Sequence, residues 1–82
     1  MEGIAATTKQ FILDEFLPGE NPADLTMSTP LISGGILDSM ATLRLVSFLE
    51  ETYGITLAPH EIGSDRIGTI ADIAKLVEGK LP

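Results

Sequence analysis

Residues 37–54 read LDSMATLRLVSFLEETYG, and this stretch carries the clearest helical pattern in the chain. From Ser39 onward, apolar side chains recur at three- and four-residue steps, which is the period of an amphipathic helix. Asp38 stands where a helix needs an N-cap, and Gly54 stands where a left-handed residue ends a helix. The stretch therefore predicts a helix from Ser39 to Gly54. Its core face consists of Thr42, Leu45, Val46, Leu49 and Tyr53.

Two more helical patterns lie on either side of this one. Residues 3–17 repeat the same spacing, and Pro18-Gly19 stops the pattern. Residues 69–72 read TIAD, which resembles a capping box with Asp in place of Glu or Gln. This box opens a last helix that Gly79 and Pro82 close. The two apolar faces are Ile4, Thr8, Phe11, Ile12 and Phe16 in the first helix, and Ile70, Ile73, Ala74 and Val77 in the last.

The connections between these helices differ in length. Residues 18–37 hold three prolines and three glycines, which argues against regular structure, but apolar residues in this range indicate that the loop packs on the body. These residues are Leu25, Met27, Leu31, Ile32, Ile36 and Leu37. Residues 58–64 are expected to form a single helical turn. The predicted fold is therefore all-α, a bundle of three main helices plus one short helix, with a long first loop.

Composition limits the class of function. The chain has 82 residues, no cysteine, and twelve acidic against five basic residues, for a net charge of −7. This charge disfavours nucleic acid and anionic membrane surfaces as partners, and no apolar run approaches the roughly 20 residues that cross a bilayer. The N-terminus lacks the pattern of a signal peptide. We expect one domain over residues 1–82, monomeric and cytoplasmic, and any thioester chemistry would need a thiol from a cofactor.

Catalysis by the chain itself finds little support. A nucleophilic serine needs a base and an oxyanion hole, but His60 is the only histidine and Ser39 lacks the G-x-S-x-G elbow. Metal sites and phosphate-binding loops are equally unsupported, since the acids are scattered and neither glycine-rich motif occurs. We therefore predict a protein that is not an enzyme.

Ser39 has two remaining explanations. It lies at the predicted N-terminus of a helix, where unpaired N–H groups and the helix dipole favour an anion such as a phosphodiester. Gly34 and Gly35 leave the nearby backbone open to another protein, and Asp38 could bind Mg²⁺ or a basic side chain. Alternatively, Asp38 and Ser39 merely cap the helix, and the residues alone do not decide between these explanations.

The motif Leu37-Asp38-Ser39-Met40 resembles the D-S-[LM] motif of the acyl and peptidyl (aminoacyl) carrier proteins. The similarity extends over the helix order, the long loop and nearly all 82 residues. It implies that Ser39 receives 4′-phosphopantetheine from coenzyme A, installed by a separate Mg²⁺-dependent phosphopantetheinyl transferase, and that Asp38 engages this transferase and its metal. The terminal thiol of the arm would then hold a cargo as a thioester.

The resemblance also places partner docking on the helix that follows Ser39. Fatty-acid-synthesis carriers are rich in acids there, whereas this chain has no acid between Ser39 and Glu50 and has Arg44 in the middle. The outward residues Met40, Leu43, Arg44 and Ser47 form a mainly apolar docking face, unless the long loop covers Met40 and Leu43. We prefer a stand-alone carrier loaded by a dedicated adenylating ligase with an amino acid or a specialised acyl group. The alternatives are a fatty-acid-type acyl carrier and an unmodified helical adaptor.

Overall fold

The computed structural model describes residues 2–81, with residues 2, 64 and 65 described by their backbone alone. The long helices are α1 (Glu2–Phe16), α2 (Ser39–Tyr53) and α4 (Ile70–Lys80), and α3 (Ser64–Ile67) is a single turn. Two 3₁₀ turns, η1 (Pro22–Asp24) and η2 (Pro59–Glu61), lie in the connections. The described residues contain no strand, so the predicted all-α class is confirmed.

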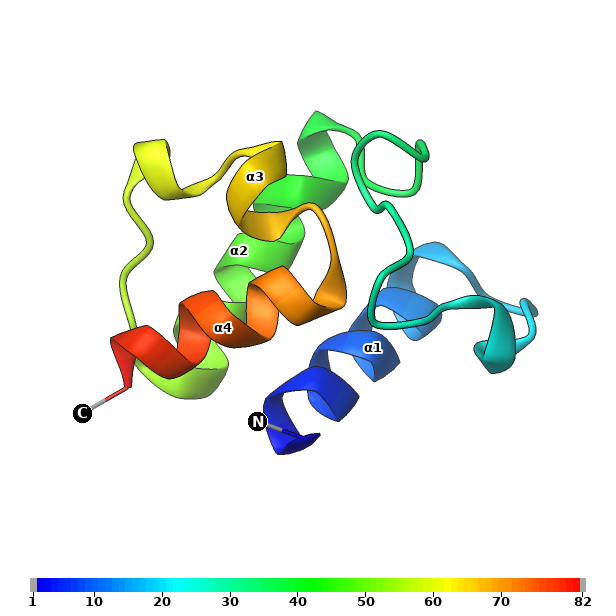
Figure 1. The fold of residues 1–82 in the computed structure, drawn as a ribbon, viewed down its shortest axis with the longest axis horizontal. Helices are drawn as coiled ribbons and strands as arrows, with labels where there is room; N and C mark the ends of the chain where they lie inside the picture. The colour runs from blue at the N-terminus through cyan, green and yellow to red at the C-terminus, as the bar shows by residue number, and fades with distance from the viewer. Residues whose placement is uncertain (1, 82) are drawn as a thin grey trace.

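The three long helices enclose one apolar core. Figure 1 shows α1 lying alongside α4, with α2 behind α4, α3 in front of α2, and the first loop at the right of the view, running from the end of α1 back towards the connection between α3 and α4. Ile12 of α1, Leu49 of α2 and Ile73 of α4 are completely buried between these helices. The core faces predicted for the three helices therefore meet one another, and hydrophobic burial along these faces holds the bundle together.

The first loop is anchored to the body at both the side-chain and the backbone level. Leu25, Leu31 and Leu37 are buried in the core, as the sequence predicted. The Leu31 N–H donates to the Gly68 carbonyl at 2.7 Å, which ties the loop to the joint between α3 and α4. Met27 corrects the prediction, since its side chain is 43% exposed. Met27 anchors the loop through its carbonyl, which accepts from the Ala71 N–H at 3.0 Å.

The paired glycines before α2 have a reason inside the loop. A Cβ atom on Gly34 would lie 2.3 Å from the Pro30 carbonyl oxygen, so the turn closes only without a side chain there. Gly35 has φ +81°, a left-handed conformation that glycine adopts without strain. Both glycines are exposed, and the expected approach of a partner protein to this backbone stays a prediction.

The segment before α4 contains two helical turns, where the sequence predicted one. The expected single turn at 58–64 is η2, which starts at Pro59, and α3 follows as a separate turn from Ser64 to Ile67. Gly63 separates the two, and its carbonyl accepts from the N–H groups of Arg66 and Ile67 at 2.9 Å each. A proline favours the first position of a helical turn, which explains why η2 forms where it does.

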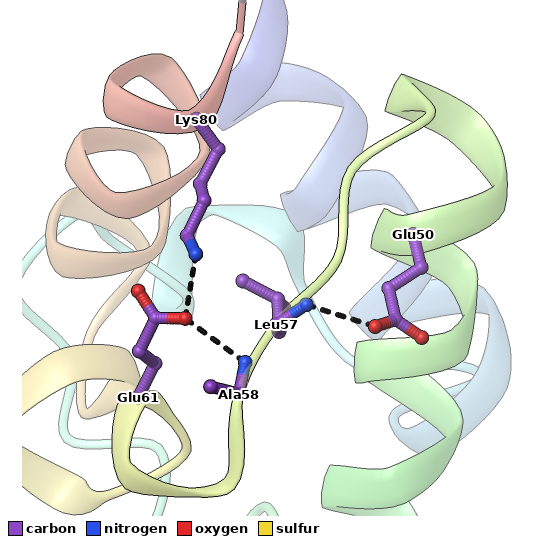
Figure 2. A network of polar contacts seen from close by, with 5 residues as sticks. All are labelled: Glu50, Leu57, Ala58, Glu61 and Lys80. Atoms are coloured by element: carbon purple, nitrogen blue, oxygen red, sulfur yellow. Dashed lines mark hydrogen bonds and ion pairs between the residues drawn. The ribbon is translucent and has the colours of Figure 1, made fainter.

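A polar network holds the segment between α2 and α3. Figure 2 shows Glu61 accepting from the Ala58 N–H at 2.9 Å and from Lys80 Nζ at 2.6 Å, and Glu50 accepting from the Leu57 N–H at 2.9 Å. The Glu61 carboxylate therefore joins the segment to the end of α4, while Glu50 joins it to α2. The Lys80 ammonium lowers the pKa of Glu61, and the Ala58 N–H lowers it further.

Candidate functional site

Ser39 is the first residue of α2, and its side chain is exposed. Asp38 is the N-cap, as predicted, and its Oδ1 accepts from the Ala41 N–H at 2.8 Å. In the described part of the chain no hydrogen bond occupies the backbone N–H groups of Ser39 and Met40. The Ser39 hydroxyl therefore lies beside two unpaired donors at the positive end of a helix, where an attached phosphate group is favoured.

A cleft of about 650 Å³ opens directly beside Ser39. One side is α2 with Thr42 and Leu43, and the opposite side is the segment that precedes α3, with Ile62 and Gly63. Ile32 and Leu37 of the first loop complete an apolar lining. The sequence did not predict the contribution of Ile62 and Gly63, because nothing in the local pattern shows that this segment crosses the start of α2.

The four predicted docking residues are all exposed and lie together. Met40 and Leu43 are 71% and 59% exposed, so the first loop does not cover them. With Arg44 and Ser47 they line one side of an open groove of about 390 Å³ between α1 and α2. The remaining lining residues, which the sequence analysis did not predict, are Phe11, Glu15, Phe48 and Glu51.

The Arg44 side chain is part of an ion pair. Its guanidinium donates to Glu15 of α1, and it lies over the Phe16 ring, 5.9 Å from the ring centre. The sequence places a positive charge in the middle of the docking face, and the structure adds a carboxylate directly beside it. The sequence could not indicate this partner, since the pair joins residues 29 positions apart on different helices.

Other candidate chemistry lies away from Ser39. His60 is exposed in η2 and is not among the residues that line the cleft at Ser39. Among the described residues no three His, Asp or Glu side chains are arranged to hold a metal ion. No described helix is long and apolar enough to cross a membrane.

Comparison with protein-family models identifies the class of the chain. The model named "PP-binding", for a phosphopantetheine attachment site, matches residues 17–77, which include the first loop, α2 and most of α4. The chain therefore belongs to the phosphopantetheine-binding carrier proteins. A comparison with curated proteins found no match.

Solved structures agree with this assignment. The fold is similar to the holo acyl carrier protein NE2163 from Nitrosomonas europaea (TM-score 0.75, 29% identity, covering 96% of this chain and 95% of that one). It is also similar to apo KstB-PCP (TM-score 0.70, 30% identity, covering 92% of this chain and 82% of that one). A third match is a chain in a crystal structure of an FAD-dependent dehydrogenase (TM-score 0.78, 33% identity, covering 85% of this chain and 97% of that one).

The family defines the cofactor and the general role. The chain is a carrier with covalently attached 4′-phosphopantetheine, and this group supplies the thiol that a cysteine-free chain lacks. An exposed hydroxyl on a helix N-terminus, next to an apolar cleft, fits such a group. Carriers of this family are typically not catalysts, and they work with phosphopantetheinyl transferases and biosynthetic enzymes.

Proposed function

We propose that Ser39 is the attachment residue and that the chain presents a thioester-bound cargo to partner enzymes. The observation that carries this proposal is the exposed Ser39 hydroxyl at the start of α2, within the matched range 17–77. Asp38 engages the transferase and its metal ion. One of its oxygens caps α2, which leaves the second oxygen to bind an incoming cation.

We further propose that a dedicated adenylating ligase loads the carrier with an amino acid or a specialised acyl group. The docking face supports this, because Met40 and Leu43 make it apolar and it lacks the dense acids of fatty-acid-synthesis carriers. A fatty-acid-type acyl carrier is the alternative. ATP-dependent loading of the phosphopantetheine form, with amino acids and fatty acids compared in one panel, separates the two.

One comparison favours an oxidative step on the cargo. The alignment with the chain from the FAD-dependent dehydrogenase structure covers 97% of that chain and 85% of this one, so that chain has the size of a carrier. We propose a flavin-dependent dehydrogenase as one downstream partner, which would transfer two hydrogens from the cargo to the flavin. The expected result is a cargo lighter by two hydrogens after incubation of the loaded carrier with such an enzyme. An unchanged mass, with the loading confirmed, would remove this partner.

The attachment site is tested by intact mass. The apo protein is incubated with coenzyme A, Mg²⁺ and a phosphopantetheinyl transferase of broad specificity. Wild type is expected to gain one phosphopantetheine group and Ser39→Ala none. Ser39→Ala should keep the fold, because Asp38 provides the cap, and loss of a cap residue costs about 0.5–2 kcal/mol. Circular dichroism checks that expectation.

Ser33→Ala is the control for this experiment, since Ser33 is an exposed serine of the first loop that lies outside the docking face. It should be modified like wild type. If the Ser39→Ala variant still gained phosphopantetheine, the assignment of Ser39 as the attachment residue would be wrong. No modification of wild type would favour the helical adaptor, in which Ser39 only begins a helix.

A further inference from the structure

The groove between α1 and α2 has an aromatic floor and an exposed apolar rim. Phe11 of α1 stacks on Phe48 of α2, with ring centres 4.1 Å apart and an angle of 15° between the planes. Among the side chains that the structure describes, Met40 and Leu43 are the two most exposed large apolar ones, and both line this groove. An exposed apolar rim beside a preformed depression is typical of a surface that a partner covers.

The charges along the groove come from both helices. Glu15 of α1 pairs with Arg44 of α2, and Glu51 lies further along α2. Because Glu15 and Arg44 compensate each other, the groove has a net charge of about −1, carried by Glu51. Without Glu15 the charges of Arg44 and Glu51 would give the groove a net charge of zero. Arg44, at the centre of the groove, would then be a cation with no adjacent carboxylate.

We propose that this groove is a docking site for a partner element with an apolar side chain flanked by a basic one, and that Glu15 determines this specificity by neutralising Arg44. The apolar side chain would enter between Leu43 and Phe48, and the basic side chain would approach Glu51. The proposal rests on the carrier function proposed above, because a carrier must be recognised by the enzymes that use its cargo. It extends the docking face from α2 to α1.

Charge complementarity decides the chemistry of the partner. The chain has a net charge of −7, and like charges across an interface lower affinity and slow association. Arg44 alone would favour an acidic partner, which the rest of the surface repels. The Glu15–Arg44 pair removes this conflict, and the guanidinium instead lies over the Phe16 ring beside the groove.

Two designed helical peptides test the proposal. They share one leucine-rich face, and the opposite face carries lysine in one and glutamate in the other. Nuclear magnetic resonance titration of the full chain gives the residues affected and the dissociation constants. Wild type should bind the lysine peptide more tightly, with shifts centred on Leu43 and Phe48. The Glu15→Gln variant should bind the lysine peptide more weakly and the glutamate peptide more tightly, with each dissociation constant changing by about two- to fivefold.

The double variant Glu15→Gln/Arg44→Gln separates charge compensation from structural damage. It removes both members of the pair, which leaves Glu51, so the preference for the lysine peptide should return towards the wild-type value. Glu20→Gln is the matched control, because it changes the net charge equally at an exposed position in the loop after α1. It should leave the preference unchanged. Leu43→Ala should weaken the binding of both peptides.

Three outcomes would overturn the inference. They are peptide-induced shifts outside the groove, an equal effect of Glu15→Gln and Glu20→Gln, and a double variant that resembles Glu15→Gln. These measurements use the apo protein, so they do not depend on modification. Mass gain at Ser39 without the charge effect would refute the docking inference alone. The charge effect without mass gain would refute the carrier proposal and leave a protein-binding groove.

Discussion

Thr8 is a buried polar residue in the apolar face of α1. Its side chain is completely buried, and its hydroxyl has no hydrogen-bond partner among the described residues. An unpaired buried hydroxyl costs about 1–3 kcal/mol, and Val has nearly the same shape without the polar atom. Thr8→Val is therefore expected to raise the free energy of unfolding by about 1 kcal/mol. Urea denaturation followed by circular dichroism measures this change.

Thr7→Val is the matched control at the residue scale. This variant makes the same substitution at the neighbouring position of α1, where the Thr7 side chain is only half-buried. Its stability should change by less than about 0.5 kcal/mol, since water can solvate the hydroxyl there. A loss of stability in Thr8→Val, with Thr7→Val unchanged, would mean that the buried hydroxyl is satisfied in solution.

At the scale of elements, the first loop delivers Ser39 to the start of α2. The Leu37 N–H donates to the Leu31 carbonyl at 2.8 Å, which closes the turn that contains Gly34. Gly34→Ala would place a methyl group against the Pro30 carbonyl, so the turn must shift. We expect a loss of about 1–3 kcal/mol in the free energy of unfolding, by the usual cost of overpacking. We also expect slower modification of Ser39.

Gly79→Ala provides the opposite expectation in another element. A Cβ atom on Gly79 meets nothing within 4 Å, and Ala is the better helix former in α4. The free energy of unfolding of this variant should rise by about 0.5–1 kcal/mol, and Ser39 should be modified at the wild-type rate. If Gly34→Ala behaved like Gly79→Ala, the close approach to Pro30 would not constrain the loop.

At the scale of the whole molecule, the Glu61–Lys80 pair joins the end of α4 to the segment beside the Ser39 cleft. The Glu61 side chain is 12% exposed, and Lys80 lowers its pKa in the folded state. A carboxyl group with a lowered folded pKa stabilises the protein above its unfolded pKa, and this stabilisation is lost as the pH falls through the folded value. Lys80→Met should therefore be less stable than wild type at neutral pH. The difference should shrink as the pH falls below the ordinary pKa of a glutamate, and it should vanish once the pH lies below the lowered folded pKa of Glu61.

Urea denaturation across a pH series measures this difference. Lys75→Met is the control, because Lys75 is an exposed lysine of the same helix. Its effect should be small and nearly independent of pH, as expected for a lone exposed charge. A constant difference between Lys80→Met and wild type down to strongly acid pH would show that the aliphatic part of Lys80, rather than the ion pair, stabilises this end of α4.

Local patterns predicted the helices because each signal acts over a few residues. The Asp38 cap, the left-handed Gly54 with φ +64° and the Thr69 cap on the Asp72 N–H all formed where the sequence indicated. The single turn expected at 58–64 formed as η2, but the sequence did not predict the second turn, α3, which begins after Gly63. Met27 was assigned to the loop anchors by its hydrophobicity, which does not show that its carbonyl makes the contact.

The sequence by itself determined the all-α class, the start of α2 at Ser39 and the side of that helix on which Met40 and Leu43 lie, because helical period and capping are local properties. Only the tertiary structure decided that Glu15 neutralises Arg44, that Phe11 stacks on Phe48, and that the segment before α3 forms one side of the Ser39 cleft. Each of these depends on how one helix or loop lies against another. That arrangement follows from burial of the whole apolar core, which no short stretch of sequence specifies.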